Sequence, residues 1–169
     1  VSVTVTAPGA VANVSRLLNL SILTSLATPA EVLTVGAVVG GAGTAGPKPV
    51  LVRAAGPSLA VFSVAVTLSD PKLEFFKGPN PIGENDNWGG DATTAAVFAQ
   101  VGAFALESGA SRDAALYAPA LTAGNHTIQI SGVAGATGAV IAEIYDATPG
   151  AGFTTTTPRL INVSVLKHI

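Results

Sequence analysis

The chain has 169 residues and is 49% hydrophobic, but only 5% of its residues are aromatic and 11% are charged. This length suits one domain around one core. A net charge of −2 gives no basic surface, so nucleic acid is excluded as an expected partner. The absence of Cys and Met excludes disulfides, thiol nucleophiles and cysteine metal sites, and no apolar run reaches the roughly 18 residues of a membrane span.

Strand patterns dominate the chain. The first, VSVTVT at residues 1–6, alternates Val with Ser or Thr, which gives one apolar and one polar face. Further strands are predicted at residues 18–22, 31–39, 49–54, 71–76, 113–118, 126–131, 139–146 and 160–165. The Gly- and Pro-rich connection at residues 41–47 suits a hairpin between the strands on either side of it.

A single helix is predicted after Asp91. Asp91 is a suitable N-cap, Ala95, Phe98 and Ala99 fall on one helical face, and Gly102 can end the helix. Many short strands with one short helix predict an all-β fold: an antiparallel, jelly-roll-like β-sandwich with extended terminal strands.

A repeat links the two ends of the chain. RLLNLSIL, beginning at Arg16, returns as RLINVSVL, beginning at Arg159, and VTAPGA at residues 5–10 resembles DATPGA at residues 146–151. The sequence therefore indicates one unit of a tandem repeat, in which the end of the chain repeats its beginning. The repeat predicts three parts: an N-terminal strand and Pro-Gly linker at 1–15, the sandwich at 16–147, and a linker with a C-terminal strand at 148–169.

GAGTAG at residues 41–46 matches the dinucleotide-binding fingerprint G-x-G-x-x-G. That motif needs a helix directly after the third glycine, whose amides hold the pyrophosphate. Here Pro47, Lys48 and Pro49 lead into a strand. The cofactor interpretation is therefore rejected, and no cofactor is expected.

GENDNWGGD at residues 83–91 is the densest polar cluster. Glu84, Asp86 and Asp91 offer oxygen ligands of the kind that Ca²⁺ prefers, which makes them a candidate calcium loop. The spacing differs from that of an EF-hand, and the same residues form ordinary turns, which is the favoured interpretation. The neighbouring Trp88 is either a core anchor or lid, which is favoured, or a platform for a sugar.

Catalytic patterns are weak in this sequence. The two histidines, His126 in a predicted strand and His168 near the end, lack a nucleophile elbow or an oxyanion loop beside them. Paired carboxylates in the 83–91 loop are equally explained by its turn. The expected protein is not an enzyme. Four sequons are candidate glycosylation sites: Asn13, Asn19, Asn125 and Asn162.

Several of these motifs together resemble a known kind of domain. RLLNLSI, VLVRAAGPSLA, ENDNW, SGASRDAAL and HTIQISGVAGATGAVIAEIYDATP are similar to a β-sandwich repeat found, often in tandem, in large secreted and cell-surface bacterial proteins. They are also distantly similar to the bacterial pre-peptidase C-terminal domain. The resemblance implies a non-catalytic accessory or structural module. In the pre-peptidase modules an acidic loop sometimes holds Ca²⁺, and the matching positions here are Asn85, Asp86 and Asn87.

Low charge with abundant Thr, Ala and Gly indicates an exported protein, extracellular or at a cell surface, and the lack of an initial Met fits a processed product or a fragment. The preferred hypothesis is a structural subunit of a filament or surface assembly. A sandwich whose terminal strands duplicate each other has one copy to spare, and that copy can pair with another molecule, giving a homopolymer. The predicted interface comprises Val1, Val3, Val5, Leu18, Leu20, Ile22, Ile161, Val163 and Val165.

The alternative is a secreted module that binds polysaccharide or cell wall, excised from a tandem-repeat protein, with the loop around Trp88 as its contact. In that case the Pro-Gly stretches are ordinary joints between domains. The strand patterns at both ends of the chain favour the assembly, because such segments are suited to pairing.

Overall fold

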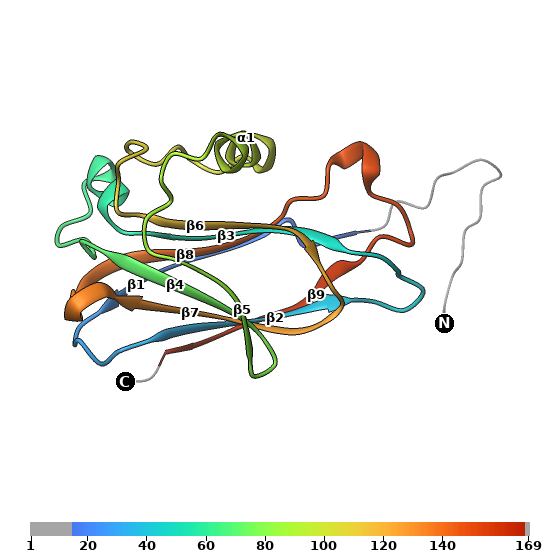
Figure 1. Ribbon diagram of the computed structural model, residues 1–169, viewed down its shortest axis with the longest axis horizontal. Coiled ribbons are helices and arrows are strands. Elements are labelled where there is room, and N and C mark those ends of the chain that lie inside the picture. The colour runs from blue at the N-terminus through green and yellow to red at the C-terminus, as the bar shows by residue number, and fades with distance from the viewer. Residues whose placement is uncertain (1–14, 168–169) are drawn as a thin grey trace, which may run out of the picture.

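A computed structural model describes residues 15–167 of the chain, and in that range the chain forms nine strands, one α-helix and three short 3-10 helices. The strands build two facing antiparallel sheets (Figure 1). The first sheet has the order β1-β8-β3-β6, from β1 (Asn19–Leu26), β8 (Gly138–Asp146), β3 (Lys48–Ala55) and β6 (Ala114–Leu121). The second has the order β5-β4-β7-β2-β9, from β5 (Asn80–Asn85), β4 (Pro71–Lys77), β7 (Gly124–Gly132), β2 (Leu33–Gly40) and β9 (Arg159–Lys167).

The order of the strands is that of a jelly roll. Sheets β1-β8-β3-β6 and β5-β4-β7-β2 are the two halves of an eight-stranded double Greek key. Strand β9 is an addition to this unit and lies outside β2. The predicted all-β, antiparallel, jelly-roll-like sandwich with one short helix is confirmed.

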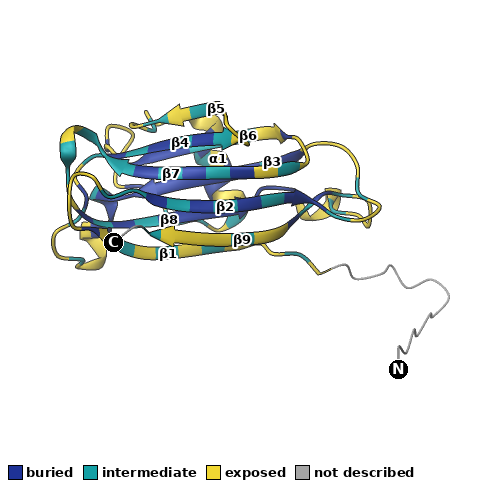
Figure 2. Cartoon of the chain, turned by 90° about the horizontal axis from the view of Figure 1, so that it is seen from below, coloured by how far each residue is buried: buried dark blue, intermediate teal, exposed yellow. Residues whose placement is uncertain are grey.

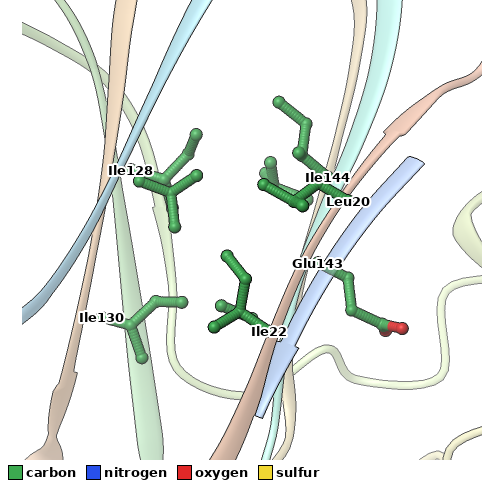
Figure 3. Close-up of a pocket in the computed structure, with 9 residues that line it drawn as sticks. Leu20, Ile22, Ile128, Ile130, Glu143 and Ile144 are labelled. Atoms are coloured by element: carbon green, nitrogen blue, oxygen red, sulfur yellow. The ribbon is translucent and has the colours of Figure 1, made fainter. Parts of the chain in front are cut away.

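The core lies between the sheets and is made of aliphatic side chains. Strand β2 alternates buried and half-buried residues along its length, as a strand covered mainly on one face should. Phe75 is the one aromatic residue of this main core. Figure 3 shows Leu20, Ile22 and Ile144 of one sheet facing Ile128 and Ile130 of the other, around a gap of only about 10 Å³. A gap of that size, lined by apolar atoms, stays dry.

Helix α1 (Ala92–Val101) covers the outer face of the four-stranded sheet. The Asp91 carboxylate caps it by accepting a hydrogen bond of 2.7 Å from the Thr94 amide, and Gly102 ends it in a left-handed conformation with φ 73°. Both predicted ends are confirmed. The buried face differs in part from the prediction, because Val97 and Phe98 pack on the sheet whereas Ala99 is exposed.

Three points of the sequence analysis are corrected. The 41–47 connection is not a hairpin, because β2 and β3 belong to different sheets and the chain crosses from one to the other. Strand β5 was not predicted at all, since Pro81 and Gly83 interrupt its apolar pattern. The sandwich also includes β9, so it runs to Lys167 rather than ending at residue 147. The strand predicted at residues 1–6 lies outside the described residues.

Candidate functional site

The two copies of the repeat become the edge strands on one side of the sandwich. Strand β1 is the edge of the four-stranded sheet, and β9 is the edge of the five-stranded sheet (Figure 2). They run in the same direction and are joined at their ends, where Lys167 Nζ donates to the Ser25 carbonyl at 2.7 Å. Because the two copies have the same pattern, we expected both to suit a single position in one sheet, which would leave one copy unpaired. Instead, each copy occupies an edge position in a different sheet.

The described residues of the predicted interface lie together on this side. Leu20, Ile22 and Val163 are half-buried and pack against the main core from the edge. The side chains of Leu18, Ile161 and Val165 are exposed, Val165 by 43% even though it is paired with the inward-facing Val35. The remaining members, Val1, Val3 and Val5, lie outside the described residues.

The edge strands differ in how they are protected against pairing with another chain. Strand β5 contains Pro81 and β6 contains Pro119, and both show an irregular register against their neighbours. Strand β9 begins and ends with charged residues, Arg159 and Lys167, and its register against β2 is also shifted. Proline, charge and bulges are the usual means of blocking an edge.

Strand β1 has none of these features. Its eight residues, NLSILTSL, carry no charge and no proline, and they pair with β8 in one unbroken register. Within residues 15–167 it is therefore the edge strand with the most regular row of main-chain groups, and on its free side only the Ser25 carbonyl at its end is bonded, to Lys167 Nζ.

The direction of those main-chain groups follows from one hydrogen bond. The Asp146 amide donates to the Leu18 carbonyl at 2.8 Å, so Leu18 is bonded to β8 and the pairing then alternates along the strand. The residues that turn their N–H and C=O groups to the free edge are Asn19, Ser21, Leu23 and Ser25, and the Ser25 carbonyl already accepts a hydrogen bond from Lys167 Nζ. Of these, Leu23 exposes 58% of its surface.

A buried ion pair joins β3 and β8 on the outer face of the four-stranded sheet. Arg53 Nη2 lies 2.5 Å from Glu143 Oε2, and its guanidinium stacks over Phe104 at 4.3 Å. The other carboxylate oxygen accepts hydrogen bonds from Ser21 Oγ at 2.9 Å and Tyr145 Oη at 2.7 Å. Burial, followed by the hydrogen bond to Glu143, raises the pKa of Tyr145 to about 12. Ser21 thus links β1 by a side-chain hydrogen bond to β8, which is paired with a strand on each side.

A second buried pair lies where β1 begins. Lys48 Nζ is 2.5 Å from Asp146 Oδ1 and donates to Thr148 Oγ1 at 2.8 Å. Arg16 reaches the same carboxylate at 3.5 Å and stacks on Phe153 at 4.3 Å. Burial lowers the pKa of Lys48, which the hydrogen bond to Asp146 partly offsets. This cluster joins the first arginine of the repeat to the aspartate that opens DATPGA.

Neither pair was predicted from the sequence. The signal was present, since β3 carries the charged residues Lys48 and Arg53, and β8 carries Glu143 and Asp146, among mainly apolar neighbours. Such residues are rarely buried unless they are paired.

The candidate calcium residues are not brought together. Glu84 forms an ion pair with Lys72 at 3.2 Å, Asp86 accepts from the Asn87 side-chain amide at 3.2 Å, and Asp91 caps α1. The Thr94 amide, through that cap, lowers the pKa of Asp91. Across residues 15–167 no three His, Cys, Asp or Glu side chains form a group suited to a metal. Calcium binding stays a prediction that these contacts do not favour.

The other residues named in the sequence analysis, where the structure describes them, make packing or hydrogen-bond contacts or lie on the surface. Trp88 packs against Phe98 with 5.4 Å between ring centroids and donates to the Ser108 carbonyl, as expected of an anchor. His126 is buried beside Phe75, and burial lowers its pKa. His168 lies outside the described residues. The sequons Asn19, Asn125 and Asn162 are exposed, whereas Asn13 lies beyond the described part.

Comparison with known proteins gives no relative: neither a family model, nor a curated protein, nor a solved structure matches the chain. The resemblance to a secreted β-sandwich repeat therefore stays a prediction. No helix within residues 15–167 has both the length and the apolar character to cross a membrane.

Proposed function

We propose that this protein is a non-catalytic structural subunit of an extracellular bacterial filament or surface assembly, whose copies join head to tail by β-strand pairing. The observation that carries the proposal is the unprotected edge of β1, beside the exposed apolar residues of β9. A strand added to such an edge gains a full row of main-chain hydrogen bonds.

The chemistry of this side suits contact with another subunit. Large apolar side chains that are exposed here include Leu18, Leu23, Ile161 and Leu166. Contiguous exposed apolar side chains on a folded domain commonly mark an interaction surface. A low charge of −2 over the whole chain keeps repulsion between copies small.

Strand donation from one copy to the next makes a contact between two different surfaces. Such a heterologous contact does not close on itself, so it extends into a chain of subunits. The proposal therefore includes filament growth rather than a fixed dimer.

The carbohydrate-binding alternative has weaker support. It relied on Trp88 as an exposed platform, whereas the Trp88 ring packs on Phe98 and its N–H is bonded to Ser108. We therefore do not carry it as a second proposal.

Sedimentation velocity over a wide range of concentrations, with negative-stain microscopy of the same samples, tests the proposed function. The expected result is a series of species larger than the 16.6 kDa monomer that grows with concentration, and visible filaments. Monomers alone at the highest attainable concentration would contradict it.

A further inference from the structure

We propose that residues 1–6 of one copy bind as an added strand along the free edge of β1 in a second copy. This inference rests on the proposed function and names its donor and its acceptor.

The donor has the chemistry that the acceptor edge requires. VSVTVT has no charge and no proline, so every residue can contribute an N–H and a C=O to a ladder. Its strict alternation lets Val1, Val3 and Val5 continue the apolar inner face while Ser and Thr face water. The inner face of β1 next to it carries Leu20 and Ile22, which are only half-buried.

The repeat supplies a second argument. The alignment that matches Pro8 with Pro149 also matches Val1 with Ala142 and Val3 with Ile144, while Val5 falls at the position of Asp146. Ala142 and Ile144 are the core-facing residues of β8 opposite Ile22 and Leu20. Val1 and Val3 therefore repeat the core-facing positions of the strand that β1 already pairs with, and β1 would receive a similar strand on its other side.

The connection after this segment points to a second copy as the acceptor. In the C-terminal copy of the repeat, residues 147–158 carry the chain from β8 in one sheet to β9 in the other, and those two strands do not pair. Residues 7–15 contain the matching Pro-Gly sequence. A connection of this type separates the two strands it joins, so residues 1–6 are not the expected neighbour of β1 within their own chain.

A strand added at the acceptor position would also bring the four-stranded sheet to the same number of strands as the five-stranded sheet. Strand β9 extends the five-stranded sheet on this side of the jelly roll, whereas β1 is the last described strand of the four-stranded sheet. A strand beside β1 extends the shorter sheet on the same side as β9, next to the exposed Val165.

Cross-linking between single-cysteine variants of the full chain tests this pairing, since the natural chain has no Cys. Thr4→Cys and Leu23→Cys place thiols on the outward faces of donor and acceptor, away from the core. The two variants are mixed and treated with a short bis-maleimide. Ala120→Cys on β6, an exposed position beside Pro119, replaces Leu23→Cys as the control, and Ile161→Cys tests the β9 edge.

The expected result is a cross-linked dimer of Thr4→Cys with Leu23→Cys, loss of that dimer with Ala120→Cys, and its suppression by excess VSVTVT peptide. A dimer formed with Ile161→Cys instead would overturn this inference while leaving the proposed function standing. A Thr4→Cys/Leu23→Cys double variant that cross-links only within the monomer would show pairing to its own edge and overturn it as well. Absence of any cross-link in a protein that stays monomeric would refute both proposals.

Discussion

Lys167 at the end of β9 donates a hydrogen bond of 2.7 Å to the main-chain carbonyl of Ser25 in β1. The same ammonium group lies 3.1 Å from Glu31, in the turn that follows β1. The amide of Ala27, followed by Lys167, lowers the pKa of Glu31. These contacts tie together two segments that share one sequence pattern yet belong to opposite sheets, and they occupy the Ser25 carbonyl at one end of the β1 edge. Among residues 15–167, no strand pairs with the rest of that edge.

The Arg53–Glu143 pair is expected to be essential for stability. Arg53→Met leaves the Glu143 carboxylate buried without its cation, which should lower the free energy of unfolding by about 3 to 5 kcal/mol. Chemical denaturation measures this value. Arg53→Met/Glu143→Gln removes the stranded charge, so it should recover part of the loss; a double variant less stable than Arg53→Met would contradict this expectation.

Tyr145 should make the protein sensitive to alkaline pH. Its pKa is raised to about 12 in the fold, against about 10 in an unfolded chain. The resulting stabilisation is fully present below pH ~10 and is lost as the pH rises toward 12. Between pH 9 and 11.5 the wild type should lose up to roughly 2 kcal/mol more than Tyr145→Phe. Equal losses in the two proteins would show that Tyr145 ionises normally.

His126 should make the free energy of unfolding depend on pH in the acid range. Its Nδ1 lies 3.1 Å from the Gly124 carbonyl and its Nε2 is buried without a described partner, so burial lowers the pKa of the ring. A lowered pKa stabilises the fold above the unfolded value of about 6.5 and loses that effect as the pH falls below it. His126→Asn keeps a donor for Gly124 and cannot titrate, so its unfolding free energy should change less between pH 7 and 5. The same dependence in both proteins would contradict this assignment.

The strands that could be predicted were those with one buried face. In β2 and β7 the alternation of side chains follows directly from covering one side of the sheet. Strand β5 escapes this reasoning because Gly83 lies where the two sheets approach closely, and a Cβ there would be 2.7 Å from Leu116 Cδ1 on β6. Such a close approach leaves no periodic signal in the sequence.

The sequence identified residues of the candidate site but not the arrangement of their strands in the fold. The repeat singled out Leu20, Ile22 and Val163, but a local pattern does not specify which sheet a strand joins. The Gly-rich stretch at 41–47 shows the same limit, since it suits a hairpin and a crossing between sheets equally well. The lack of protection on β1 became visible only when all edges were known.

Gly56 should tolerate no side chain. A Cβ at this position would lie 2.0 Å from the Leu68 carbonyl oxygen, and the Gly56 amide is bonded to the buried Asp113 carboxylate. Gly56→Ala should cost about 3 kcal/mol of unfolding free energy. Gly150→Ala, with no atom within 4 Å of the added Cβ, is the matched control and should stay within about 0.5 kcal/mol of the wild type. Similar values for the two variants would be inconsistent with the packing described here.

The free edge of β1 should control assembly. Leu23→Pro removes one outward-facing N–H without breaking the ladder to β8, whereas Leu23→Thr shortens the same exposed side chain and keeps the N–H. Both variants should retain the β-sheet circular dichroism of the wild type and unfold cooperatively.

Sedimentation velocity of the wild type, Leu23→Thr and Leu23→Pro at matched high concentration tests the proposed assembly most directly. Large species are expected for the wild type and for Leu23→Thr, and a folded monomer is expected for Leu23→Pro. A folded Leu23→Pro variant that assembles as fully as the wild type would contradict assembly through the edge of β1.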